Sequence, residues 1–183
     1  MKFTETGFDG LWEIKPSIFE DHRGYFMESF QSRLFREVGI TDLFVQDNRS
    51  FSKKGVLRGL HFQKAPHEQG KLVGATSGSV LDVVVDLRPD SRTFGKYYKC
   101  LLDDRQHNML YVPAGFAHGF LALEDSLFTY KCTEFYHKES EMGIFWNDPQ
   151  LDIDWGDLSN PIISEKDQAL PGFQEVVKIL AHG

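Results

Sequence analysis

The chain has 183 residues, of which 41% are hydrophobic, enough for one domain with a sizeable core. Its net charge of −7, without any basic cluster, argues against a nucleic-acid-binding protein, which needs a concentrated positive surface. The sequence contains neither a signal-peptide pattern nor an apolar run long enough to span a bilayer. We therefore expect a single domain over residues 1–183 that has no membrane partner and lies in the cytoplasm.

Short runs of β-branched and aromatic residues recur along the chain and predict strands. These runs are 11–14, 25–30, 79–87, 94–102, 109–112, 119–123 and 126–136. The turn residues Glu124 and Asp125 predict that the last two runs pair as a hairpin. Helices are predicted over 32–38, where Gly39 would end the helix, and over 174–180. Many short strands with glycines between them predict an all-β sandwich or barrel with a few short helices near the two ends.

The stretch 55–73 combines strand residues with polar side chains and contains a proline turn. Because alternate residues of a strand share a face, His61 and Gln63 point to one side, and Leu60 and Phe62 to the other. If the polar face looks into a barrel, an imidazole lies beside cationic side chains in a cavity. That arrangement suits proton transfer on an anionic substrate.

Chemistry without a metal would need a base, cations and a proton donor, and the chain offers all three. His61 would be the base and Tyr130 an opposing phenol, so that a proton leaves one face and returns to the other. Lys71 and His118 could stabilise an enolate oxygen, and arginines such as Arg58 could pair with phosphate. Taken one at a time, however, a strand histidine, lysine or tyrosine is more often structural or solvated.

A second hypothesis places a metal ion in the cavity. The Pro-x-Gly-x-x-His motif from Pro113 to His118 resembles the one with which cupin barrels supply a metal-binding histidine. The other half of the cupin pattern, His-x-His followed by Glu, reads here as His61-Phe-Gln63 with Glu68 downstream. Gln63 replaces an imidazole ligand, so His61, His118 and Glu68 form a sparse ligand set for a transition metal. We expect neither a metal nor another cofactor.

Specific blocks follow one another along nearly the whole chain: Asp21–Glu28, Gln46–Ser50, Gly55–Gln63, Gln69–Lys71, Val83–Arg88, Pro113–Phe120, Trp146–Pro149 and Ser164–Asp167. Together they resemble the dTDP-4-dehydrorhamnose 3,5-epimerase family. The resemblance implies a metal-free jelly-roll barrel of the cupin type and a homodimer that exchanges N-terminal strands. It also implies an isomerase that converts dTDP-4-dehydro-6-deoxy-D-glucose at C3 and C5 to dTDP-4-dehydro-L-rhamnose, on the route to dTDP-L-rhamnose for cell-surface polysaccharides.

The resemblance also implies a role for individual residues. His61 matches the general base, Asp167 the acid that orients it, Tyr130 the opposing proton donor and Lys71 a group that stabilises the enolate. Tyr136 matches the aromatic position that stacks on thymine. Substrate contacts are implied for Arg23, Glu28, Gln46, Asp47, Asn48, Arg58, Lys71, His118, Glu141 and Lys166. Inversion of one carbon only, a metal-dependent cupin enzyme and a non-catalytic nucleotide-sugar binding module are the alternatives.

Overall fold

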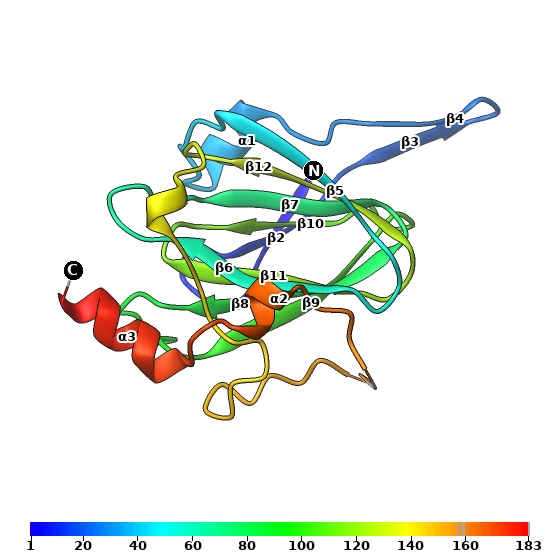
Figure 1. The fold of residues 1–183 in the computed structure, drawn as a ribbon. Coiled ribbons are helices and arrows are strands. Elements are labelled where there is room, and N and C mark those ends of the chain that lie inside the picture. Colours follow the sequence, from blue (N-terminus) through cyan, green and yellow to red (C-terminus); the bar gives the residue numbers. More distant parts are fainter. Residues whose placement is uncertain (157, 159, 183) are drawn as a thin grey trace.

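Two antiparallel sheets packed face to face make up most of the computed structural model, which describes residues 1–156, 158 and 160–182 (Figure 1). The six-stranded sheet has the order β1 (Lys2–Glu5), β2 (Trp12–Lys15), β10 (Met109–Val112), β7 (Lys71–Ser77), β12 (Ser126–Cys132) and β5 (Gln46–Ser52). The five-stranded sheet has the order β13 (Glu141–Gly143), β6 (Leu57–Gln63), β11 (Phe116–Ala122), β8 (Ser79–Asp86) and β9 (Tyr97–Asp103). The predicted all-β class with a few short helices is therefore confirmed.

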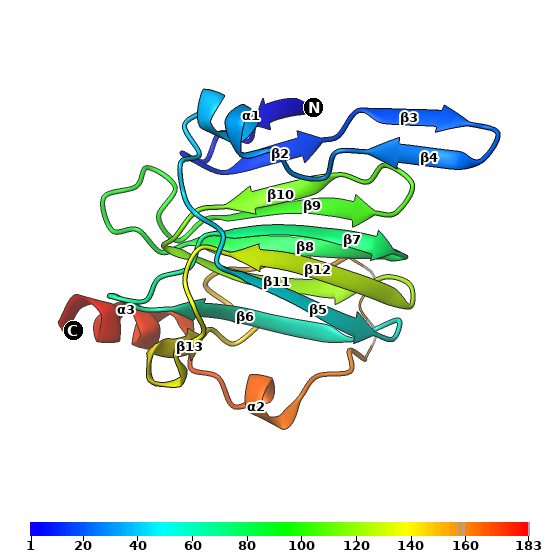
Figure 2. The same ribbon diagram turned by 90° about the horizontal axis from the view of Figure 1, so that it is seen from above.

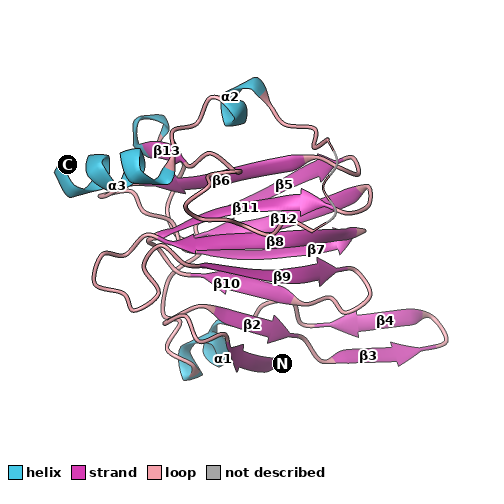
Figure 3. Cartoon of the chain, turned by 90° about the horizontal axis from the view of Figure 1, so that it is seen from below, coloured by secondary structure: helices cyan, strands magenta, loops and turns pink. Residues whose placement is uncertain are grey.

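The helices are short and lie outside the sheets (Figure 3). They are α1 (Ser32–Glu37), α2 (Glu165–Gln168), α3 (Phe173–His182) and the 3-10 turn η1 (Lys138–Ser140). As predicted, Gly39 ends the first helix: its φ is +86°, and its N–H bonds to Arg36 O. Within the described residues, none of these helices has the length and apolar character that crossing a bilayer requires.

Strand alternation divides the apolar side chains into layers. The layer between the two sheets includes Val73, Val84 and the stacked rings of Phe120 and Phe128, whose centroids are 4.3 Å apart. The outer face of the five-stranded sheet is covered by the C-terminal segment, which contributes Trp155, Phe173 and Val176. Leu60 and Phe62 pack into this outer layer. Their alternation with His61 and Gln63 therefore agrees with the prediction, because those two residues line the inner cavity.

One predicted pairing is wrong: residues 119–123 and 126–136 do not form a hairpin. Strand β11 belongs to the five-stranded sheet, whereas β12 pairs with β5 and β7 in the other sheet. The turn at 124–125 is a corner where the chain crosses between the layers. It stacks on the corner between β7 and β8, where a Cβ on Gly78 would lie 2.4 Å from Asp125 O. Turn residues identify a change of direction, but the partner sheet depends on contacts distant in sequence.

A separate hairpin, β3 (Ile18–Asp21) with β4 (Gly24–Met27), extends beyond the edge of the sandwich (Figure 2). The polar residues 20–24 form its tip, and the strand before them is β3, a segment for which no strand was predicted. Phe19 and Phe26 on this hairpin are 62% and 65% exposed. Exposed large apolar side chains of this kind are typical of interaction surfaces.

Candidate active site

A cavity of about 550 Å³ opens between the two sheets. Strands β6 and β11 form one wall, β5, β7 and β12 form the other, and the segments around β13 and α2 border it. Most predicted site residues line it: Gln46, Asn48, Arg58, His61, Lys71, His118, Tyr130, Tyr136, Glu141, Lys166 and Asp167. Residues separated by more than 100 positions in the sequence thus come together here.

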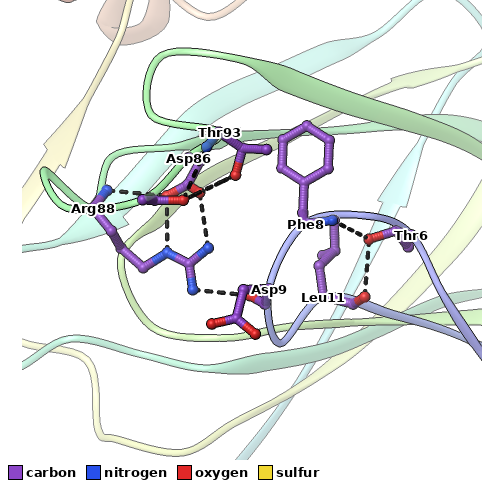
Figure 4. A network of polar contacts seen from close by, with 8 residues as sticks. Thr6, Phe8, Asp9, Leu11, Asp86, Arg88 and Thr93 are labelled. Atoms are coloured by element: carbon purple, nitrogen blue, oxygen red, sulfur yellow. Dashed lines mark hydrogen bonds and ion pairs between the residues drawn. The ribbon is translucent and has the colours of Figure 1, made fainter.

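A larger crevice of about 750 Å³ lies elsewhere, between the N-terminal loop and the loop after β8. Figure 4 shows why this crevice is structural. The fully buried Asp86 accepts hydrogen bonds from Arg88, Ser91 and Thr93, and Arg88 Nη1 donates to Asp9 O at 2.9 Å. These bonds saturate the carboxylate and tie the two loops together. None of the predicted site residues, all of which the structure describes, lines this crevice.

A bulge in β6 brings Arg58 to the cavity. His61 lies opposite His118 on β11, whereas Arg58 lies opposite Phe120. Moving three residues along β6 therefore corresponds to moving two residues along β11. The extra residue reverses the alternation, and Arg58 faces the same side as His61. Gly59 permits this geometry, since its φ is +114° and an added Cβ would lie 2.6 Å from Gly119 Cα.

The imidazole of His61 is held by the carboxylate of Asp167. The Nε2–Oδ1 distance is 2.7 Å, and the side chains are 31% and 5% exposed. Asp167 Oδ2 accepts from Gly59 N at 3.2 Å, and Ser164 Oγ caps helix α2 by accepting from Asp167 N at 3.1 Å. Burial raises the pKa of Asp167, but the bonds from His61, Gly59 and Ser164 outweigh it and lower the pKa overall.

This contact fixes which ring nitrogen of His61 is basic. An ionised carboxylate can only accept, so the neutral ring carries its proton on Nε2, which donates to Asp167. The lone pair then lies on Nδ1. The pair therefore leaves Nδ1 as the ring nitrogen that could accept a proton from a ligand.

A second histidine–carboxylate pair lies on the neighbouring strands. His118 Nε2 is 2.8 Å from Asp82 Oδ2, and the two side chains are 9% and 0% exposed. Lys71 reaches the same cavity from β7. Burial lowers the pKa of Lys71, partly opposed by Cys132, Asp82 and Glu141. The sequence analysis did not assign Asp82 to the site; an acidic side chain within a strongly apolar strand was the available signal.

Tyr130 enters the cavity from the opposite sheet. It lies on β12, opposite Val73 on β7 and Asn48 on β5. Burial raises the pKa of its phenol, and Cys132 adds to this effect while Arg58 opposes it. The phenol consequently keeps its proton at neutral pH, as a proton donor must.

Tyr136, Glu141 and Lys166 form a hydrogen-bonded group at the cavity. Glu141 Oε2 accepts from Tyr136 Oη at 2.8 Å and from Lys166 Nζ at 2.6 Å. Burial alone would raise the pKa of Glu141, but these two bonds lower it. Tyr136 remains 53% exposed, so its ring is accessible to a ligand. An aromatic face beside paired charges is suited to a nucleobase.

Comparison with known proteins identifies the family. A family model described as dTDP-4-dehydrorhamnose 3,5-epimerase matches residues 5–175. The chain belongs to this family. The epimerase of Methanothermobacter thermautotrophicus is 49% identical over 170 residues, which cover 91% of both chains. The family assignment confirms the isomerase class and the epimerase function predicted from the sequence.

Solved structures share the fold. A Legionella pneumophila 3,5-epimerase in complex with dTDP-4-keto-L-rhamnose has a TM-score of 0.92 and 46% identity, covering 98% of this chain and 96% of its own. A 3′-monoepimerase from Streptomyces bikiniensis in complex with dTDP-quinovose has a TM-score of 0.88 and 32% identity, covering 94% and 88%. These epimerase neighbours confirm the predicted jelly roll of the cupin type.

Three predicted substrate contacts lie outside the cavity. Arg23 and Glu28 belong to the projecting β3–β4 arm and to the residues just after it, and the side chain of Arg23 is 78% exposed in its ion pair with Asp21. Asp47 points away from the cavity on β5 and pairs with Lys131 at 2.8 Å. Within this one chain, therefore, the fold does not bring these residues to the site.

The residues of the alternative metal site are engaged elsewhere. His61 and His118 each direct Nε2 at a carboxylate, and the exposed Glu68 does not line the cavity. Among the described residues, no group of three histidine, cysteine or acidic side chains is arranged to hold a metal ion. Gln63, at the position of the missing cupin histidine, hydrogen-bonds to backbone groups of two loops.

Proposed function

We propose that this chain, as a single domain over residues 1–183 in the cytoplasm, epimerises dTDP-4-dehydro-6-deoxy-D-glucose at C3 and C5 with the residues described here. The observation that carries the assignment is the His61–Asp167 pair on one wall of a cavity that Tyr130 enters from the other. A base and a protonated phenol from opposite sheets can act on opposite faces of one sugar ring. The product is dTDP-4-dehydro-L-rhamnose.

Proton transfer accounts for the reaction without other chemistry. The C4 ketone acidifies the protons on C3 and C5, and His61 removes one of them through its basic nitrogen. The electron pair of the broken C–H bond moves into an enolate, whose oxygen is stabilised by Lys71 and His118. Tyr130 then delivers a proton to the opposite face of the same carbon, and the C4 ketone forms again. Once His61 has released its proton to solvent and Tyr130 has taken one up, the second carbon is inverted in the same way.

Remote groups hold the nucleotide. Arg58 is placed to pair with the diphosphate, and Tyr136 to stack on thymine beside Gln46, Asn48 and Lys166. Binding energy from these non-reacting parts orients the sugar at His61.

A homodimer completes this site. The exposed arm carries Arg23 beyond the edge of its own sandwich, Glu28 directly follows the arm, and the exposed Phe19 and Phe26 need cover (Figure 2). In a two-fold dimer each arm reaches the partner's cavity, so that both sites gain these charged side chains.

Proton NMR in deuterium oxide tests the reaction. With dTDP-4-dehydro-6-deoxy-D-glucose and a chelator present, we expect deuterium at both C3 and C5. The His61→Ala variant should remain folded, judged by circular dichroism, and should exchange neither position. Exchange at C3 alone would indicate a mono-epimerase, the activity named for the Streptomyces bikiniensis neighbour. No exchange would overturn the proposal, as would wild-type turnover by His61→Ala.

A further inference from the structure

The segment between β12 and β13 carries Tyr136 but belongs to neither strand, so its backbone groups need other partners. Glutamine side chains that line the cavity supply them. Gln69 Nε2 donates to Glu134 O at 2.7 Å, and Gln46 Oε1 accepts from Tyr136 N at 3.1 Å. Side chains thus replace the neighbouring strand that would normally fix such a segment.

Gln63 makes the central contacts of this arrangement. Its Nε2 donates to Phe135 O at 3.0 Å and to His67 O at 2.6 Å, and its Oε1 accepts from His137 N at 2.6 Å. The side chain is 5% exposed, and both amide hydrogens are used. One carboxamide therefore holds the backbone on both sides of Tyr136 and connects it to the turn after β6.

The histidine rings reinforce the connection between the same two loops. His67 and His137 stack with their centroids 3.6 Å apart and their planes 11° apart. On β6, Gln63 follows His61 by two residues and faces the same cavity. The base that acts on the sugar and the residue that fixes the Tyr136 loop are therefore parts of one rigid strand.

We propose that Gln63 is a positioning residue for the nucleobase: it sets the place of Tyr136 relative to His61, and Gln69 assists it. The proposal rests on the function given above, in which Tyr136 stacks on thymine. A misplaced ring would weaken nucleotide binding, although the reacting groups around His61 stay in place. In metal-binding cupin barrels, the position of Gln63 holds a metal-binding histidine. In this chain it would instead fix the position of the ring that binds the nucleobase.

Calorimetric titration with dTDP tests this role without turnover. Gln63→Glu keeps the side-chain shape but removes both Nε2 donors and places an acceptor beside two carbonyl oxygens. Because each buried unpaired group is costly, we expect Kd for dTDP to rise by about tenfold or more. Gln174→Glu makes the same chemical change in an exposed glutamine on α3 and should leave Kd unchanged.

A double-mutant cycle separates positioning from general damage. In a Tyr136→Ala background there is no ring to position, so Gln63→Glu should have no further effect on Kd. Equal losses in both backgrounds, a wild-type Kd for Gln63→Glu, or no dTDP binding by the wild type would overturn the proposal. If Gln63→Glu does not fold, the cycle can be repeated with Gln69→Glu, which removes only the contact to Glu134 O, again in the presence and absence of Tyr136→Ala. If the two substitutions are coupled in dTDP binding but the wild type exchanges no proton at C3 or C5 of the sugar, only the proposed function is contradicted.

Discussion

The carboxylate of Asp167 decides which nitrogen of His61 is basic, because it accepts from Nε2 at 2.7 Å. In Asp167→Asn, the carboxamide can present an N–H to the ring and move the ring proton to Nδ1. We expect kcat to fall by about 10²- to 10⁴-fold, the usual contribution of a positioned base, with little change in KM. Steady-state kinetics would measure both. Asp154→Asn makes the same change in an exposed ion pair with Lys99 and should retain wild-type kcat.

The same variant should alter acid stability. The pKa of Asp167 in the folded protein lies below the ordinary value of 3.8, because hydrogen bonds outweigh burial. The carboxylate therefore contributes stability that is fully present above pH 3.8 and is lost as the pH falls through the lower folded value. The difference in unfolding free energy between wild type and Asp167→Asn should be constant at neutral pH and shrink in acid. Denaturant titrations across pH would show this, and a difference that grows in acid would contradict it.

The bulge in β6 is the element on which the cavity wall depends, since it brings Arg58 and His61 to one face. A Cβ on Gly59 would lie 2.6 Å from Gly119 Cα and 2.8 Å from His118 O, contacts that no side-chain rotation relieves. We expect Gly59→Ala to lower the free energy of unfolding by about 3 kcal/mol or more. Gly39→Ala, at φ +86° with nothing within 4 Å, should cost only the backbone strain of about 1–2 kcal/mol. Denaturant midpoints would compare them, and equal losses would refute the packing argument.

Local sequence signals identified several elements well. Residues 109–112 form β10 as predicted, and the helix predicted over 32–38 is α1 with Gly39 after its end. The pairing of strands was harder to predict, because alternation identifies a strand but not the sheet to which it belongs. The predicted hairpin of 119–123 with 126–136 was therefore wrong. Strict alternation would also have turned Arg58 away from His61. A one-residue bulge depends on the close approach of Gly59 to Gly119, and no local pattern reports that contact.

At the scale of the molecule, the site assembles residues from β5, β6, β7, β11, β12 and α2, which no spacing rule relates. From residue types alone, the metal and metal-free hypotheses both stayed open, and resemblance to a family was needed to connect Asp167 with His61. The two-sheet packing supplies the missing physical reason. Closing the sandwich brings Tyr130 to the cavity that His61 lines, and α2 adds Asp167 at its border.

The role proposed for the projecting arm can be tested only in the dimer. If Arg23 serves the partner's cavity, Arg23→Ala and His61→Ala homodimers should each lose activity, for different reasons. A mixed dimer would contain one intact site, with His61 from the first variant and Arg23 from the second. Unfolding and refolding the two variants together should therefore restore about a quarter of wild-type activity, because half of the dimers are mixed and each has one working site. Refolding each variant alone is the control. If the arm serves its own chain, mixing restores nothing, since neither variant then contributes a complete site.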